Sequence, residues 1–198
     1  MEQASRTHPS VLVVVDMQQC FRRSDSQWCV PRYDEIVPVI GALEHSFEGR
    51  SMYTRFVADP AEPGAWKSYY DRWDEMRLPP DAADWDFTVE VPADAQTLSV
   101  PTFSKWGPTL AELVPPGGEL VLAGVATDCC VLSTALGAID AGRFVTVISD
   151  ACAAVSDEAQ AQTLAILRLL APLCRVVTSA EFASVQARRS NSPDRTSL

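Results

Sequence analysis

The chain has 198 residues, a length that suits one domain with a substantial core and is short for two. Apolar residues make up 47% and charged residues 21%, which is typical of a globular protein and excludes wholesale disorder. A formal net charge of −10 argues against nucleic acids and anionic membranes as partners.

The N-terminal stretch, MEQASRTHPS, lacks the basic segment and apolar run of a signal peptide, so we expect a cytoplasmic protein with reduced thiols. No apolar run is long enough to span a bilayer. The six cysteines form no C-x-x-C pair, and the only histidines are His8 and His45. Because structural zinc sites use such spacings, we expect no bound metal, and nothing in the pattern calls for another cofactor.

Between two polar tails, residues 1–9 and 188–198, short β-branched runs alternate with helical patterns. SVLVVVDM, residues 10–17, is a near-continuous apolar run, which is typical of a central parallel strand buried on both faces. Apolar residues at helical spacing follow over residues 34–47. RSMYTRFV, residues 50–57, is then predicted to be the second strand.

Residues 58–95 interrupt this alternation. Their first part is rich in Pro, Trp, Tyr and charge, and it is too long for a simple connection in a compact domain. Three tryptophans and two tyrosines argue against disorder. We therefore expect an inserted segment that serves as a lid, a pocket wall or an oligomer contact.

After the insertion, strands and helices alternate again. Turn residues and apolar periodicity predict strands at residues 119–125, 143–150 and the start of 174–187, and helices at 129–142, at 156–172 behind the capping residue Ser156, and at the end of 174–187.

This order predicts one three-layer α/β/α domain over residues 10–187, doubly wound around a central, mainly parallel β-sheet. In such sheets ligands bind outside the carboxyl ends of the strands. Asp16 and the Gly124–Cys130 turn both stand at such ends, so we look for the functional residues there.

Two adjacent cysteines, Cys129 and Cys130, occupy the second of these turns. A thiol in the first turn of a helix lies at the positive end of the helix dipole, which stabilises the thiolate. Backbone N–H groups at the same place can bind an oxyanion. The residues alone leave three interpretations open: a nucleophile, a redox or metal pair, or small residues packed in a core, which is the commonest role of buried cysteine.

Asp16 and Lys105 are similarly ambiguous. Asp16 closes a buried strand either as a turn residue or as a partly buried carboxylate that exchanges protons. Lys105, in TFSKWGPTL, is either a surface charge or a partner that orients the carboxylate and favours the thiolate. Spacing alone does not bring these side chains together with a cysteine.

Three segments taken together resemble the isochorismatase-like cysteine hydrolase superfamily: VLVVVDMQQCF, FSKWGPTL and AGVATDCCVLSTALGAIDAGRFVTVISDACAA. That group includes nicotinamidases, N-carbamoyl amidohydrolases, ureidoacrylate-type amidases and true isochorismatases. The likeness runs from about residue 10 to about residue 186 and is weakest over the insertion. It implies the Rossmann-like, isochorismatase-like hydrolase fold and a hydrolase that acts on carbon–nitrogen bonds other than peptide bonds.

Matched by position, the resemblance assigns catalytic roles to Asp16, Lys105 and Cys130, because the motif CVLSTA begins at Cys130. It assigns the oxyanion hole to the backbone N–H groups of Ala126 and Cys130, and it implies a cis peptide bond between Val125 and Ala126. Cys129 then becomes a packing residue. The implied mechanism is attack by the Cys130 thiol, deprotonated by Asp16, followed by hydrolysis of a thioester by water.

Two departures from the family narrow the reaction. Nicotinamidases carry a metal-binding Asp and two His after the second strand, where this chain reads YTRFVADPAEPGAW without histidine. The resemblance therefore indicates a member without metal. True isochorismatases commonly lack the cysteine, so cleavage of an amide, ureido, carbamoyl or lactam C–N bond of a small molecule is favoured over ether cleavage.

Substrate specificity is expected to come from the insertion and from residues near the three catalytic positions. Aromatic side chains could line an apolar wall and basic ones could bind a substrate carboxylate, although packing or a subunit interface would explain most of them equally well. The candidates are Phe21, Arg55, Trp66, Tyr70 and Trp106, with Tyr69, Trp73, Lys67, Arg72 and Arg77 as further possibilities.

Other functions stay open at this point. The chain could be an isochorismatase-type hydrolase of a different small substrate, a thiol-redox protein that uses Cys129 and Cys130, or a scaffold without activity. The complete set of Asp16, Lys105 and Cys130 argues against the scaffold. The resemblance also implies a homo-oligomer, a dimer or tetramer, that acts on a small-molecule amide.

Overall fold

The computed structural model describes residues 10–47 and 49–190, so the predicted tail 1–9 and residues 191–198 lie outside the described part. Within it, six strands form one sheet in the order β3-β2-β1-β4-β5-β6, and every neighbouring pair is parallel. The predicted fold class is confirmed. The strands are β1 (Val11–Val15), β2 (Ser51–Phe56), β3 (Gln96–Val100), β4 (Glu119–Val125), β5 (Phe144–Ala153) and β6 (Cys174–Val177).

The strand order reverses between β1 and β4. The chain runs outward from β1 through β2 to β3, and then returns to the other side of β1 and runs outward again from β4 to β6. Val11 to Val15 pair with Leu120 to Gly124, and every residue of both strands is buried, as the apolar runs predicted. A crevice for ligands is expected outside the carboxyl ends of strands at such a reversal.

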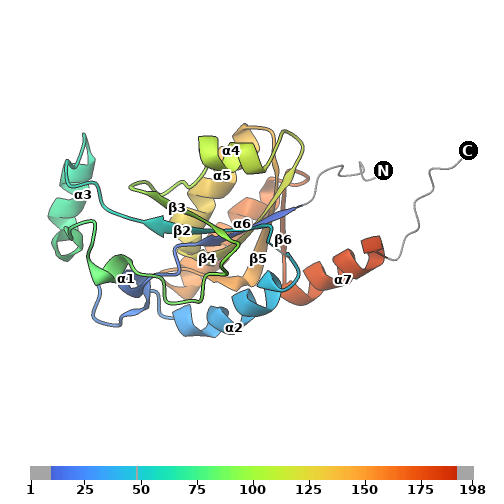
Figure 1. Ribbon diagram of the computed structural model, residues 1–198, viewed down its shortest axis with the longest axis horizontal. Helices are drawn as coiled ribbons and strands as arrows, with labels where there is room; N and C mark the ends of the chain where they lie inside the picture. Colours follow the sequence, from blue (N-terminus) through green and yellow to red (C-terminus); the bar gives the residue numbers. More distant parts are fainter. Residues whose placement is uncertain (1–9, 48, 191–198) are drawn as a thin grey trace, which may run out of the picture.

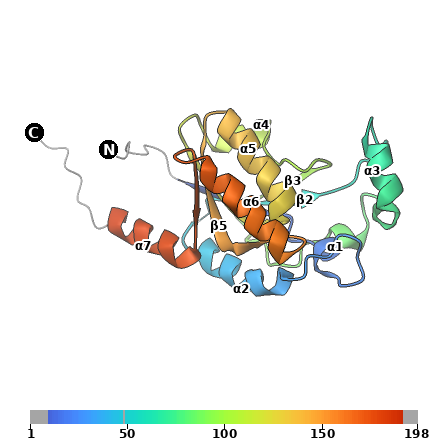
Figure 2. The same ribbon diagram turned by 180° about the vertical axis from the view of Figure 1, so that it is seen from behind.

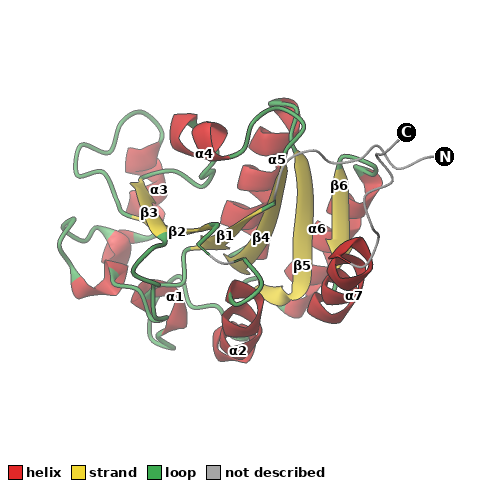
Figure 3. Ribbon diagram, turned by 45° about the vertical axis from the view of Figure 1, so that its right-hand side comes forward, coloured by secondary structure: helices red, strands yellow, loops and turns green. Residues whose placement is uncertain are grey.

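Helices cover both faces of the sheet (Figures 1 and 3). One apolar cluster joins α2 and α7 to Leu12 and Val14, and the other joins α4, α5 and α6 to Val13 and Val15; Figure 2 shows α5 and α6 in front of the sheet. None of the helices in the described ranges combines the length and apolarity of a membrane span. The helices are α1 (Gln19–Arg22), α2 (Tyr33–Glu44), α3 (Trp66–Arg72), α4 (Pro108–Leu113), α5 (Leu132–Asp140), α6 (Asp157–Leu169) and α7 (Ser179–Ser190).

Most predicted elements appear close to their expected positions, although the short helices α1, α3 and α4 were not predicted. Ser156 caps α6 as predicted, because its hydroxyl accepts a hydrogen bond of 3.1 Å from the N–H of Ala159. The C-terminal tail was placed too early, since α7 continues through residue 188 to Ser190. Strand β3 was not predicted, because it lies at the edge of the sheet and none of its side chains is fully buried.

The segment 58–95 is largely an ordered part of the domain. It contains α3 and two short 3₁₀ turns, and Figure 1 shows α3 near α1 at the end of the molecule toward which β2 points. Tyr70, Met76 and Trp85 are buried in the same cluster as Leu12. The side-chain amide of Gln18 ties the segment to the sheet, because its Nε2 donates to the carbonyls of Phe56 (3.0 Å) and Trp85 (2.8 Å).

Candidate active site

Asp16 is the first residue after β1, and its side chain is completely buried. Its φ of 51° lies in the left-handed region, which is uncommon for a residue other than glycine. The N–H of Asp16 donates to the carbonyl of Thr54 (3.1 Å), and the Thr54 hydroxyl donates to Oδ1 of Asp16 (2.8 Å). Strand β2 thus sets the direction in which the carboxylate points.

Lys105 lies in the loop between β3 and α4, and it forms an ion pair with Asp16. Nζ is 2.8 Å from Oδ2 of Asp16, and both side chains are 0% exposed. Nζ also donates to the carbonyl of Thr102 (3.0 Å) and lies 5.1 Å from the ring centre of Phe56. Breaking a buried pair of this kind leaves one charge without a partner, at a cost of about 3–5 kcal/mol. The structure therefore brings together two residues that spacing alone could not join.

The two cysteines follow β4 in a wide turn. The peptide bond between Val125 and Ala126 is cis. The carbonyl of Ala126 accepts hydrogen bonds from the N–H groups of Cys129 and Val131, both at 3.1 Å, and α5 begins at the next residue. Cys130 is 3% exposed, whereas Cys129 is half-buried.

Thr134, one turn into α5, connects this turn to the loop that carries the lysine. Its hydroxyl donates to the carbonyl of Cys130 (2.7 Å) and accepts from the N–H of Lys105 (2.9 Å). Thr134 is completely buried. Since Lys105 in turn contacts Asp16, hydrogen bonds and an ion pair link the ends of β1, β3 and β4 into one unit.

The thiols of Cys129 and Cys130 have opposite pKa shifts. The hydrogen bond with Cys129, burial and the Asp16 carboxylate raise the pKa of Cys130 well above its usual range, although Lys105 acts the other way. The hydrogen bond with Cys130 lowers the pKa of Cys129 in spite of its burial. For Cys130 these causes outweigh the stabilisation of the thiolate that is expected at a helix terminus. At neutral pH this thiol keeps its proton and needs a base to remove it.

A cavity of about 260 Å³ opens beside the two thiols. Ala126 and Cys130, the two predicted donors of an oxyanion hole, both line it. The rest of the lining is largely aromatic and aliphatic, and it consists of Phe21, Gln27, Trp28, Val30, Phe56, Tyr69, Trp73, Phe103, Asp128, Cys129 and Val155.

Of the five main substrate-binding candidates, the structure places only Phe21 in this lining. Trp66 and Tyr70 pack in the aromatic cluster around it, with ring centres 6.1 Å apart. Trp106 lies against Arg143, whose guanidinium carbon is 4.9 Å from the ring centre. Arg55 donates to the hydroxyl of Ser99 (3.1 Å).

Sequence reasoning missed several residues of the cavity wall. Phe103, two positions before Lys105, was within a quoted motif and could have been inferred from it. Trp28 and Phe56 could not have been inferred in this way. Trp28 stands in an irregular segment, and the sequence does not distinguish Phe56 from the other buried residues of its strand. Tyr69 and Trp73, named only as further possibilities, also line the cavity.

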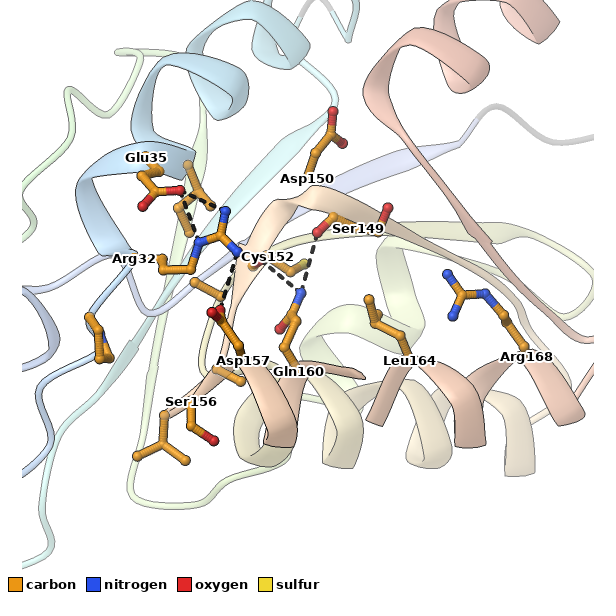
Figure 4. Close-up of a pocket in the computed structure, with 15 residues that line it drawn as sticks. Arg32, Glu35, Ser149, Asp150, Cys152, Ser156, Asp157, Gln160, Leu164 and Arg168 are labelled. Atoms are coloured by element: carbon orange, nitrogen blue, oxygen red, sulfur yellow. Dashed lines mark hydrogen bonds and ion pairs between the residues drawn. The ribbon is translucent and has the colours of Figure 1, made fainter. Parts of the chain in front are cut away.

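A larger hollow of about 720 Å³ lies between the start of α2, the end of β5 and α6 (Figure 4). Its polar groups are largely engaged: Arg32 pairs with Glu35 and Asp157, and Nε2 of Gln160 donates to the carbonyls of Ser149 and Cys152. None of the predicted catalytic residues lines it. Cys130 lines the smaller cavity, which is therefore the candidate site, whereas Asp16 and Lys105 are buried outside its lining.

The residues that follow β2 do not fit a metal site. Oδ1 of Asp59 accepts the N–H of Ala61 (2.9 Å), and Glu62 forms an ion pair with Arg77 (2.7 Å). In the described part of the chain, no group of three His, Cys, Asp or Glu side chains is arranged to hold a metal ion.

The sequence of this chain is similar to that of a known protein family. Residues 10–181 match the model of the isochorismatase domain family. Isochorismatase domain-containing protein 2 of Xenopus laevis is 27% identical over 150 residues, which is 74% of this chain. The match spans 62% of the length of that relative, so the chain corresponds to less than two thirds of it.

Two solved structures share the fold. A cysteine hydrolase from Pseudomonas syringae pv. phaseolicola 1448A has a TM-score of 0.76 at 18% identity, covering 88% of this chain and 91% of that one. A pyrazinamidase of Pyrococcus horikoshii, solved in complex with zinc, has a TM-score of 0.68 at 24% identity, covering 85% and 98%. At these identities the likeness extends to the fold alone.

Proposed function

This chain belongs to the isochorismatase domain family, and we propose that it is a cysteine-dependent amidohydrolase that cleaves a C–N bond of a small molecule through a thioester on Cys130. The bond is an amide, ureido, carbamoyl or lactam bond. Asp16, Lys105 and Cys130 carry the reaction, and the backbone N–H groups of Ala126 and Cys130 form the oxyanion hole.

The observation that carries the proposal is the buried Asp16–Lys105 ion pair at the reversal of the strand order, linked through Thr134 to the turn that holds Cys130. Apolar residues of similar volume would stabilise a core at least as well as a buried ion pair, so the pair is better explained by chemistry than by stability. The Asp16 carboxylate interacts electrostatically with the Cys130 thiol, whose raised pKa means that it needs a base to lose its proton.

The mechanism follows from these positions. Asp16 takes the proton of Cys130 as Sγ attacks the carbonyl carbon, and the N–H groups of Ala126 and Cys130 hold the oxyanion. Loss of one such donor costs about 2.7–4 kcal/mol of transition-state stabilisation. Asp16 then gives its proton to the departing amine nitrogen as the C–N bond breaks. Water attacks the thioester, releases the acid and returns the proton to Sγ. Lys105 holds the Asp16 carboxylate in place throughout.

A thiol-redox role for Cys129 and Cys130 is less well supported. A disulfide between them would join adjacent residues, whose Cα atoms are about 3.8 Å apart across a trans peptide bond. Ordinary disulfides have Cα separations of about 4.4–6.8 Å, so the turn would have to rearrange. The hydrolytic mechanism needs the Cys130 thiol reduced, which suits the cytosol better than an oxidising compartment.

Ammonia or amine release from a panel of small amides and ureides tests the proposal. Wild type should turn over at least one member, and Cys130→Ala should lose about a thousandfold or more in kcat. Cys129→Ala is the matched control and should keep activity. Loss of activity in Cys129→Ala with retention in Cys130→Ala would contradict the assignment. Product masses separate ring opening, which adds one water and releases no amine, from linear amide hydrolysis.

The family resemblance also supports a homo-oligomer, a dimer or tetramer. Ile166 and Leu169 on α6 are 50% and 83% exposed, and Leu136 on α5 is 40% exposed, so this face has apolar surface to bury. Sedimentation velocity measures the mass directly. A monomer at micromolar concentration would contradict this part of the proposal.

A further inference from the structure

Charge is unevenly distributed around the cavity that holds Cys130. Asp128 is the one carboxylate among the described residues that line it, and the same lining contains no Lys or Arg. Most of the remaining wall is aromatic or aliphatic. A substrate that enters this cavity therefore leaves water and meets mainly apolar side chains and one carboxylate.

The basic residues that could have bound a substrate carboxylate are occupied elsewhere. Nε of Arg77 is 2.7 Å from Glu62 and its Nη2 is 2.5 Å from Asp71. Lys67 lies 3.8 Å from the same Asp71 carboxylate. The guanidinium of Arg72 stands over the ring of Trp73, 5.2 Å from its centre.

Lys105 does not supply the missing positive charge to a substrate. Its side chain is 0% exposed, and its charge is matched by Asp16 at 2.8 Å. Its remaining contacts are the carbonyl of Thr102 and the ring of Phe56. The pair is neutral as a whole, so it leaves the negative charge of Asp128 uncompensated.

Asp128 is held beside the reacting thiol by its own turn. It lies two residues before Cys130, and its Oδ1 accepts a hydrogen bond of 3.3 Å from the N–H of Val155, another residue of the lining. In the same lining, Trp28 stacks on Phe21 with ring centres 5.8 Å apart and packs edge-on against Phe56 at 5.2 Å. The lining thus combines an aromatic cluster with a carboxylate held by a backbone hydrogen bond.

We propose that this site takes amides whose acyl side is uncharged and apolar, and that Asp128 is the residue that rejects substrates bearing a carboxylate. An anion would lose its hydration in an apolar cavity and meet a like charge there, with no basic side chain to offset either cost. The inference rests on the proposed function, since it assigns a substrate class to the same site.

Binding to the full-length Cys130→Ser variant tests this selectivity without turnover. Isophthalamide and 3-carbamoylbenzoate have nearly the same shape and differ by one negative charge. Calorimetric titration should give at least about tenfold tighter binding of the neutral ligand. Adding Asp128→Asn, which keeps the oxygen that accepts from Val155, should reduce this ratio by about tenfold by improving the affinity for the anion.

Asp140→Asn is the matched control, because it removes an equal charge from the far end of α5, outside the cavity lining. It should leave the ratio as in Cys130→Ser alone. Equal binding of both ligands, no binding of either at millimolar concentration, or an equal effect of Asp128→Asn and Asp140→Asn would each overturn the inference. If the neutral ligand binds selectively but wild type releases no ammonia from any amide, the proposed function fails while the charge selectivity stands.

Discussion

Each carboxylate oxygen of Asp16 has its own partner: the Thr54 hydroxyl on Oδ1 and the Lys105 ammonium on Oδ2. With both oxygens engaged, the carboxylate has its direction set before any substrate arrives. Such preorganisation matters because small displacements of a catalytic group cost large factors in rate.

Replacing Thr54 by Val removes the hydroxyl and keeps the shape of the side chain. We expect kcat to fall about ten- to hundredfold with little change in KM, because the base is misplaced in the reacting complex. The lost buried hydrogen bond should also lower the free energy of unfolding by about 1–3 kcal/mol. Thr54→Ser restores the hydroxyl and should recover both kcat and stability. Steady-state kinetics measure kcat and KM, and urea unfolding measures stability. An equal loss of kcat in Thr54→Val and Thr54→Ser would contradict the positioning role of the hydroxyl.

The pKa shifts of the two thiols lead to a separate prediction about how their reactivity depends on pH. The hydrogen bond with Cys129 is the first cause of the raised pKa of Cys130, so Cys129→Ala should lower that pKa. At a fixed pH of about 8 a larger fraction of Cys130 is then thiolate, and iodoacetamide should label it faster. In wild type the first thiol to react should be Cys129, whose pKa is lowered.

Peptide mapping after brief labelling across about pH 6 to 9 provides the measurement. The labelling curve of Cys130 should move to lower pH in Cys129→Ala. A curve that stays in place, or one that moves to higher pH, would show that Cys129 does not control the ionisation of Cys130. Cys174→Ala, a buried thiol on β6, is the control that should leave the curve unchanged.

At this scale the structure adds contacts and pKa shifts to residues that the sequence could only name. Asp16, Lys105 and Cys130 were assigned through short motifs, and the contact between the first two could be seen only after folding. The raised pKa of Cys130 could not be anticipated, because the hydrogen bond with Cys129, the burial and the approach of a carboxylate more than a hundred positions away all depend on the folded chain. The place of Trp28 in the cavity wall likewise depends on folding, since its local sequence does not indicate it.

At the scale of elements, the crevice depends on how closely β4 approaches β1. Gly124 has a φ of 113°, and a Cβ added there would lie 2.1 Å from the carbonyl oxygen of Val15. The β4–β5 register also shifts between Leu122 and Gly124. Because Gly124 has no side chain, the end of β4 can lie directly against Val15, the residue before Asp16.

Gly124→Ala should therefore be strongly destabilising, by about 4 kcal/mol or more, since neither backbone can move without breaking the sheet. Gly41→Ala is the matched control: it lies inside α2, nothing is within 4 Å of its added Cβ, and it should stabilise by about 0.5–1 kcal/mol. Urea midpoints compare the two. A Gly124→Ala variant as stable as wild type would disprove the close approach.

Strands that are buried on both faces were predicted more accurately than exposed or irregular segments. β1 and β4 were located within about a residue or two because each is an apolar run buried on both faces. β3 was missed because Gln96, Thr97 and Ser99 face solvent at an edge, which leaves no apolar period. The irregular segment 58–95 has no period either, and its path is fixed by long-range contacts such as those of Gln18.

At the scale of the whole molecule, the inserted segment and the sheet share one core. Tyr70 and Trp85 are 2% and 1% exposed in the same apolar cluster as Leu12 and Val14 of β1. Three of the five tryptophans lie in residues 58–95, so fluorescence reports mainly on that segment, whereas far-ultraviolet circular dichroism reports on all helices and strands.

We therefore expect the two signals to give the same urea midpoint, as in a single cooperative unit. Trp85→Phe, which keeps a large ring in the core, should shift both midpoints together. An earlier fluorescence transition, with the circular dichroism midpoint unchanged, would mean that residues 58–95 unfold independently and that the wall of the cavity is not part of the main core.

The central claim is that Cys130, activated by Asp16, forms a covalent acyl intermediate. Acid quenching after brief exposure to 4-nitrophenyl benzoate, followed by intact mass and peptide mapping, tests it most directly. We predict one benzoyl group on Cys130 in wild type and in Cys129→Ala, none in Cys130→Ala, and slower acylation in Asp16→Asn. A benzoyl group on Cys129 instead, or acylation that survives Cys130→Ala unchanged, would contradict the mechanism.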